Sequence, residues 1–174
     1  MLKVNSFLET KNAGMCGPAS LKMVLNYFGT NATEAELASL CGTDAVNGTS
    51  DLGIKKAAEK FGFTVEIKNF CTYQDIDHWL SKGIPVIVDW FTKGPSDSLD
   101  DQVADGHYSV VVDLDNTYIY LQDPEIGKIR KISRDDFWSV WFDFTGASIN
   151  SWDEMIIRQI IIIYPPVYFK EIFK

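Results

Sequence analysis

The chain has 174 residues, of which 46% are hydrophobic and 13% aromatic. This length suits one domain, and this apolar content excludes a disordered chain, because apolar burial can offset the entropy lost on ordering. The net charge of −8 argues against a nucleic-acid partner, since phosphate binding requires clustered Lys and Arg and the 16 present here are scattered.

The amino-terminal half predicts four helices separated by stop signals. Helix-start residues (Pro18, or Ser and Thr caps) precede apolar segments, and glycines follow most of them. The predicted helices cover residues 18–28, 33–40, 51–61 and 73–81. A short strand at 63–67, which alternates apolar and polar residues, lies between the third and the fourth helix.

The second half predicts antiparallel strands. Apolar runs bounded by turn residues indicate strands at 84–90, 107–113, 118–122, 128–132 and 156–164. The turn signals DLDN and DPEIG join the middle three runs as a meander, and residues 92–106 are rich in Gly, Pro, Ser and Asp, which predicts a loop. Ser133 with Asp136 predicts a helix to about residue 141. The fold class is therefore α+β.

Cellular location follows from what the sequence does not contain. The first residues, MLKVNSFLETKNAG, include no apolar run like that of a secretion signal. The longest apolar run, Ile160 to Tyr164, is too short to span a bilayer and predicts a buried strand. Cys16, Cys41 and Cys71 form no CxxC pair, which favours reduced thiols and leaves one disulfide open. We expect a cytoplasmic chain that does not span a membrane.

Cys16 is the first candidate for chemistry, because it directly precedes the most apolar predicted helix. Unpaired backbone N–H groups and the positive end of the helix dipole favour a thiolate at that position, and the thiolate is the nucleophilic form. A lone cysteine is also often a small buried hydrophobe, so position alone does not decide between the two interpretations.

A nucleophilic cysteine needs a base, and the chain has two histidines. His78 lies inside a predicted helix, whereas His107 begins a strand directly after the long loop, where functional side chains are often displayed. Asp123 ends the next strand, so an antiparallel pairing could let it accept a hydrogen bond from the His107 ring and fix its tautomer. The alternatives are a structural histidine and a simple turn-opening Asp before Pro.

These residues lie in segments that resemble a known family. The runs CGPASLKMVLNYFG, GHYSVVV and LQDPEIG, the last followed by a helix with FWSVW, resemble the bacteriocin-processing cysteine peptidases of the papain-like superfamily, which remove double-glycine leader peptides. The resemblance covers about residues 9–141. It implies a papain-like fold, with an amino-terminal helical half, a carboxy-terminal antiparallel sheet half and the active site between them. It also implies Cys16 as nucleophile, His107 as general base and acid, and Asp123 as the orienting residue.

The sequence departs from the family pattern at one catalytic position. Family members carry a Gln six residues before the cysteine, where its amide helps to stabilise the oxyanion, but position 10 here is Thr10. The Thr10 hydroxyl or the Asn12 carboxamide could donate instead. Losing one such donor costs about 3 kcal/mol, roughly a hundredfold in rate.

Three functions therefore stay open. The first is a cysteine peptidase that cleaves a peptide or protein substrate through a thioester. The second is a catalytically weak papain-like module that binds peptides, for which the missing Gln is the evidence. The third is a thiol acyl-transferase of the same architecture, for which no residue is decisive.

The remaining expectations concern cofactors and context. We expect no cofactor and no metal, because a zinc site built from Cys16, His107 and Asp123 would lack any local ligand pair. Members of the resembled family often form the amino-terminal part of a membrane transporter, and no transporter sequence follows here. We expect a single stand-alone domain over residues 1–174, with its oligomeric state open.

Overall fold

A computed structural model describes residues 1–11, 14–92, 105–145 and 149–166. Most of the predicted loop over 92–106 lies outside these ranges, as does Asn12. Three described residues of that loop differ from the prediction, because Thr92 ends one strand and Asp105 and Gly106 begin the next.

All five predicted helices are present, with ends within one or two residues of the prediction. They are α1 Cys16–Tyr27, α2 Glu34–Cys41, α3 Asp51–Lys60, α4 Tyr73–Leu80 and α5 Arg134–Val140. The helix α1 begins two residues earlier than predicted, so Pro18 is its third residue. Proline is tolerated there because the N–H groups of a first turn have no partner within the helix, and the N–H that proline lacks therefore breaks no helical hydrogen bond. No described helix has both the length and the apolar character needed to cross a bilayer.

The starts of α2, α3 and α5 are fixed by local hydrogen bonds, as the sequence predicts. The Thr33 hydroxyl accepts from the Glu36 N–H at 3.2 Å, and the Ser50 hydroxyl accepts from the Gly53 N–H at 3.1 Å. Ser133 caps α5 in the same way. Each cap satisfies an N–H that has no partner within the helix, so it sets where the helix begins.

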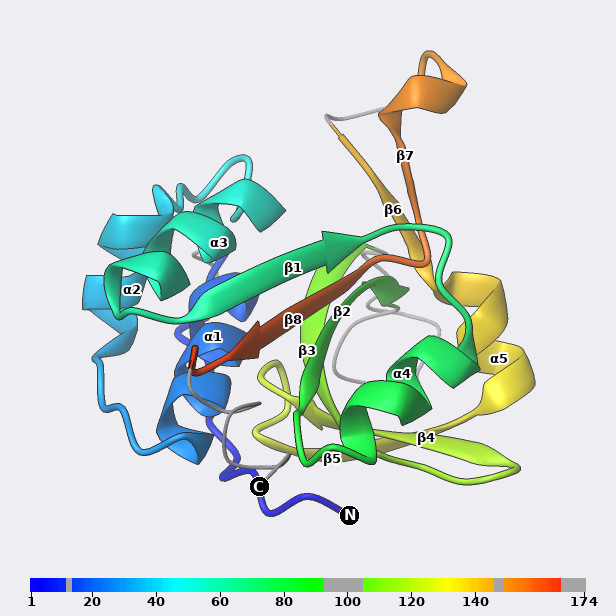
Figure 1. The fold of residues 1–174 in the computed structure, drawn as a ribbon. Coiled ribbons are helices and arrows are strands. Elements are labelled where there is room, and N and C mark those ends of the chain that lie inside the picture. Colours follow the sequence, from blue (N-terminus) through cyan, green and yellow to red (C-terminus); the bar gives the residue numbers. More distant parts are fainter. Residues whose placement is uncertain (12–13, 93–104, 146–148, 167–174) are drawn as a thin grey trace.

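One six-stranded antiparallel sheet forms the centre of the molecule (Figure 1). Its strand order is β1-β8-β2-β3-β4-β5. The strands are β1 Thr64–Lys68, β2 Val86–Thr92, β3 Asp105–Leu114, β4 Tyr118–Asp123, β5 Lys128–Ser133 and β8 Ile160–Tyr164. The predicted meander is confirmed, because β3 pairs with β4 and β4 with β5, both antiparallel.

The final strand predicted over 156–164 is wrong as a single strand. Arg158 adopts a left-handed conformation with φ of 46° and divides the segment into β7 Met155–Ile157 and β8. The Arg158 backbone N–H donates to the Trp141 carbonyl, and its Nε donates to the Cys71 carbonyl, so contacts distant in sequence hold the break. β7 pairs with β6 Phe142–Phe144, a strand that the sequence did not predict, and the short helix η1 Trp152–Glu154 precedes β7.

The sheet has a core on each face. The helices α1, α2 and α3 cover one face, and α4 and α5 lie on the other side of the sheet (Figure 1). The run of four isoleucines in β8 is buried throughout and supplies both cores: Ile161 and Ile163 pack with α1, whereas Ile160 and Ile162 pack with α4. A central strand covered on both faces therefore reads as a continuous apolar run.

A buried hydrogen bond joins α1 to β3. Ser20 lies one turn after Cys16 and is fully buried, and its hydroxyl donates to the Tyr108 carbonyl at 3.1 Å. Because Tyr108 follows His107 directly, this bond sets the start of α1 against the start of β3.

Replacing Ser20 by Ala tests this anchor. We expect the free energy of unfolding to fall by about 1 kcal/mol, because the Tyr108 carbonyl loses a buried donor. Urea denaturation measures the change, and Ser39→Ala at an exposed position of α2 is the matched control, which should not destabilise the chain. Equal stability of the two variants would contradict the anchoring role.

Candidate active site

Cys16 is the first residue of α1 and is partly exposed, whereas Cys41 and Cys71 are buried, and all three are free thiols. Met15 at the N-cap offers no side-chain hydrogen bond, so the N-cap residue leaves the N–H groups of the first turn uncapped. The next residue is Gly17, where a side chain would not fit, because a Cβ at this position would lie 2.7 Å from the Thr49 Cβ. Cys16 therefore lies at an uncapped helix start, as predicted.

The predicted hydrogen bond between His107 and Asp123 is present. The register places Val110 of β3 opposite Gln122 of β4, which brings the start of β3 beside the end of β4. The His107 Nε2 lies 2.8 Å from the Asp123 Oδ1, and the exposed fractions of the two residues are 4% and 0%. Asp123 also opens the turn, as its carbonyl accepts from the Gly127 N–H. The catalytic and the turn interpretations of Asp123 are thus compatible.

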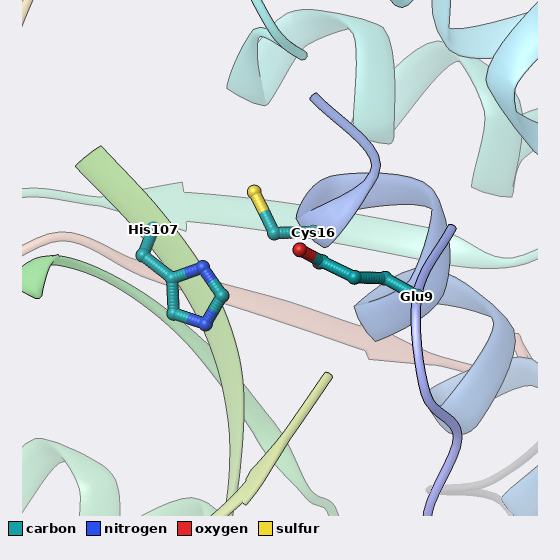
Figure 2. A group of neighbouring side chains, drawn as sticks. All are labelled: Glu9, Cys16 and His107. Atoms are coloured by element: carbon teal, nitrogen blue, oxygen red, sulfur yellow. The ribbon is translucent and has the colours of Figure 1, made fainter. Parts of the chain in front are cut away.

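The thiol of Cys16 faces the His107 ring. The sulfur and a ring nitrogen lie within 4.8 Å, and Figure 2 shows the Cys16 and His107 side chains next to each other. Because Nε2 is bonded to Asp123, Nδ1 is the nitrogen available to the thiol. Burial alone would lower the pKa of His107, but hydrogen bonds to Asp123 and Cys16 and their negative charges outweigh it, so this pKa is raised well above its usual value. The imidazolium form is therefore favoured.

Two further groups hold the Asp123 carboxylate. Its Oδ1 also accepts from the Glu125 N–H at 2.9 Å, and its Oδ2 accepts from the Arg130 Nε. The Arg130 Nη2 in turn donates to Glu125 at 3.1 Å. Burial opposes ionisation, but the His107 hydrogen bond and the charges of His107 and Arg130 lower the pKa of Asp123. Asp123 is therefore a carboxylate held in a fixed position. The Trp90 ring packs edge-on against the His107 imidazole.

Glu9 is the site residue that sequence reasoning missed. The amino-terminal segment runs along the sheet: the Leu2 N–H donates to the Val112 carbonyl, Gln122 donates to the Val4 carbonyl, and the Glu9 N–H donates to the Pro124 carbonyl at 2.9 Å. A Glu9 carboxylate oxygen lies within 4.8 Å of the Cys16 sulfur and a His107 ring nitrogen. Figure 2 shows the three side chains converging from three separate elements.

The Glu9 carboxyl is in an unusual environment. Its Oε2 is buried and has no hydrogen-bond partner among the described residues. Burial is the main cause that raises the pKa of Glu9 to about 7; the charge of His107 opposes the rise, and the charges of Glu125, Asp123 and Glu34 add to it. Glu9 therefore changes its charge near neutral pH.

The two predicted oxyanion donors have different outcomes. Thr10 is exposed, and its hydroxyl donates to Glu34 at 2.6 Å while its backbone N–H donates to the same carboxylate at 3.0 Å. The hydroxyl proton of Thr10 is thus already engaged. Asn12 lies outside the described residues, so its role stays a prediction. Glu9 lies seven positions before Cys16, one position from the family Gln, and its side chain has the length of a Gln side chain. These two features were the signal in the sequence that could have identified Glu9 as a site residue.

The same groups have metal-ligand spacing. Within the described residues, two triplets bring their donor atoms within 4.8 Å of one another: Glu9 with Cys16 and His107, and His107 with Asp123 and Glu125. Both triplets share the His107 ring, whose Nε2 is already bonded to Asp123 and whose raised pKa favours the proton over an ion. The expectation of a metal-free site stays a prediction.

A groove of about 1150 Å³ adjoins this site. Leu8 and Glu125, the neighbours of Glu9 and Asp123, line it together with Trp90, Arg130 and Ile129. Cys16 and His107 do not line the groove, so it lies beside these two residues and does not enclose them. Its mixture of apolar and charged walls suits a peptide.

Residues 6–149 match the model of the peptidase C39 family. The chain belongs to this family. Among its relatives, a lactococcin transport/processing ATP-binding protein of Lactococcus lactis is 32% identical over 136 residues, which is 77% of this chain and 17% of that protein. The lactococcin-G-processing and transport ATP-binding protein of the same species is 36% identical over 117 residues, 67% of this chain and 15% of that protein. The chain thus spans a small part of these relatives.

A relative of similar size comes from an archaeon. An uncharacterised protein of Methanothermobacter marburgensis is 34% identical over 137 residues, which is 75% of this chain and 77% of that protein. C39 peptidases are cysteine peptidases, so the family assigns the hydrolase class.

Solved structures agree with this fold. The peptidase domain of Streptococcus ComA, a bi-functional ABC transporter involved in quorum sensing, is 25% identical and superposes with a TM-score of 0.69 over 93% of this chain and 98% of that one. A double glycine motif protease in complex with its leader peptide, 22% identical, has the same fold with a TM-score of 0.63, covering 94% of this chain and 93% of that one. The predicted papain-like α+β fold is confirmed.

Replacing Asp123 by Asn tests the charge coupling in the pair. The amide preserves the shape but removes the negative charge that stabilises the imidazolium, so we expect the pKa of His107 to fall. An NMR titration of the His107 ring protons measures it, with Asp135→Asn on the exposed face of α5 as control. An unchanged titration of His107 in Asp123→Asn would contradict the coupling.

Proposed function

We propose that this protein is a cysteine peptidase that hydrolyses a peptide bond with Cys16 as nucleophile, His107 as general base and acid, and Asp123 as the orienting carboxylate. The observation that carries the proposal is the buried hydrogen bond between His107 and Asp123. The second ring nitrogen of His107 then faces the Cys16 thiol at the start of α1. Membership of the peptidase C39 family supports it.

The chemistry follows from this arrangement. The His107 ring holds the proton of Cys16 as an imidazolium, and the Cys16 thiolate attacks the substrate carbonyl carbon, which moves an electron pair to the carbonyl oxygen. When the tetrahedral intermediate collapses, the C–N bond breaks and the imidazolium gives its proton to the departing amine. The acyl group is then held on Cys16 as a thioester. Water, deprotonated by His107, attacks the thioester and releases the acid and the thiol.

We propose a precursor peptide cleaved after a double glycine as the substrate. Two relatives at 32% and 36% identity are named as transport/processing proteins for lactococcins, and this chain matches a part of each. The groove beside the site, with Leu8 and Ile129 among its apolar walls, offers a surface for a peptide segment outside the scissile bond.

The thiols of the chain provide a substrate-free test. At about pH 7 we expect iodoacetamide to label Cys16 at least about tenfold faster than the other two cysteines. Burial raises the pKa of Cys41 to about 12 and is the main cause that raises the pKa of Cys71 to about 11, which keeps both thiols protonated and covered. Peptide mass spectrometry reads each site, and His107→Ala should remove the advantage of Cys16. Equal labelling of all three would contradict a catalytic thiol.

The same preparations then test turnover. Wild type should cleave a peptide that contains a Gly-Gly site, and Cys16→Ala should not. If wild type bound the peptide without cleaving it, and Cys16→Ala bound it equally, the chain would be a binding module. Products that carry an added amine in place of water would indicate an acyl-transferase.

A further inference from the structure

Attack by a thiolate creates a negative oxygen, and the site must hold it. In acyl-transfer enzymes, two or more hydrogen-bond donors aimed at this oxyanion supply much of the rate. The uncapped first turn of α1 offers the Cys16 N–H as one donor. The Thr10 hydroxyl already donates its hydrogen bond to Glu34. Among the described residues, the side chain that reaches both the Cys16 sulfur and the His107 ring from the amino-terminal segment is Glu9.

The ionisation state of Glu9 decides what it can do at this position. A carboxylate only accepts hydrogen bonds and would repel a developing oxyanion. A carboxylic acid can donate its O–H to the oxyanion, just as a carboxamide can donate one of its N–H groups. The buried Oε2 has no partner among the described residues, so a proton on it would be free to bond a substrate oxygen.

We propose that Glu9, as the neutral carboxylic acid, is the second donor to the oxyanion, which makes this peptidase active in acid and turns it off as Glu9 ionises. This rests on the proposed function. Glu9 keeps its proton throughout the reaction: it donates a hydrogen bond as the C–S bond forms and the carbonyl oxygen becomes negative, and the bond weakens when the C–N bond breaks. His107 alone transfers protons.

Burial is the main cause that favours the neutral form of Glu9, and the charged groups that face it act in both directions. Negative charges come from three sides: Glu34 on α2, Asp123 at the end of β4, and Glu125 in the turn that follows. The imidazolium of His107 on β3 opposes them, and Cys16 on α1 faces the same space. Burial outweighs the charge of His107, so the pKa of Glu9 rises to about 7. The donor is therefore present below neutral pH and is lost as the pH rises through that value.

The test compares wild type, Glu9→Gln and Glu9→Ala by kcat/KM for a Gly-Gly peptide from about pH 5 to pH 9. Wild type should lose about tenfold in rate for each pH unit above the pKa of Glu9. Glu9→Gln keeps a neutral donor, so it should match wild type near pH 5.5 and exceed it at least about tenfold near pH 8.5. Glu9→Ala should be about a hundredfold slower than wild type in acid. Glu59→Gln, exposed on α3, is the control and should follow wild type.

Two results would overturn the assignment while leaving the peptidase intact. Parallel pH profiles of wild type and Glu9→Gln would show that Glu9 only supports the structure. Loss of activity in Glu9→Gln at every pH, with activity retained in Glu59→Gln, would show that the carboxylate form is the one required.

A second measurement needs no turnover. A peptide ending in glycine aldehyde forms a hemithioacetal with a catalytic thiol, and its oxygen occupies the oxyanion position. Wild type should bind this aldehyde at least about tenfold more tightly near pH 5.5 than near pH 8.5, and the ratio should be smaller in Glu9→Gln. If wild type neither cleaved the peptide nor bound the aldehyde at any pH, the proposed function and this assignment would both fail.

Discussion

The hydrogen bond between His107 and Asp123 is the constraint on which the site depends. It joins two neighbouring strands at the point where β3 begins and β4 ends, and both residues are buried. A buried carboxylate is costly unless it is paired, and Asp123 is paired three times, by the His107 ring, the Glu125 N–H and Arg130. These bonds leave one ring nitrogen of His107 facing the thiol.

The rest of the fold brings Cys16 to that nitrogen. The start of α1 is held against β3 by the bond from Ser20 to the Tyr108 carbonyl, and the apolar face of α1 packs on the sheet through residues such as Leu21 and Val24. The amino-terminal segment has no helix or strand of its own, yet hydrogen bonds to β3, to β4 and to the turn after β4 carry Glu9 to the same place. Three separate segments thus converge on one small volume.

The sequence predicted what local physics decides. Caps such as Ser50 and stop glycines predicted the helices. The apolar runs and the alternating run at 63–67 predicted all six strands of the central sheet, with β8 as part of a longer strand. The pairing of His107 with Asp123 was also predictable, because a short turn joins their strands. The break at Arg158 was not predictable, because it depends on the distant Trp141 and Cys71 carbonyls. The sequence offered Glu9 as a carboxyl seven positions before Cys16, but its place beside His107 depends on hydrogen bonds between distant segments.

The central claim is that Cys16 carries the acyl group, and trapping that group is its most direct test. Wild type is mixed with an activated ester of a Gly-Gly peptide, quenched in acid within milliseconds and examined by peptide mass spectrometry. We expect a thioester on the peptide that contains Cys16, formed in a burst that His107→Ala abolishes. Acylation at Cys41 or Cys71, or a burst that persists in His107→Ala, would contradict it.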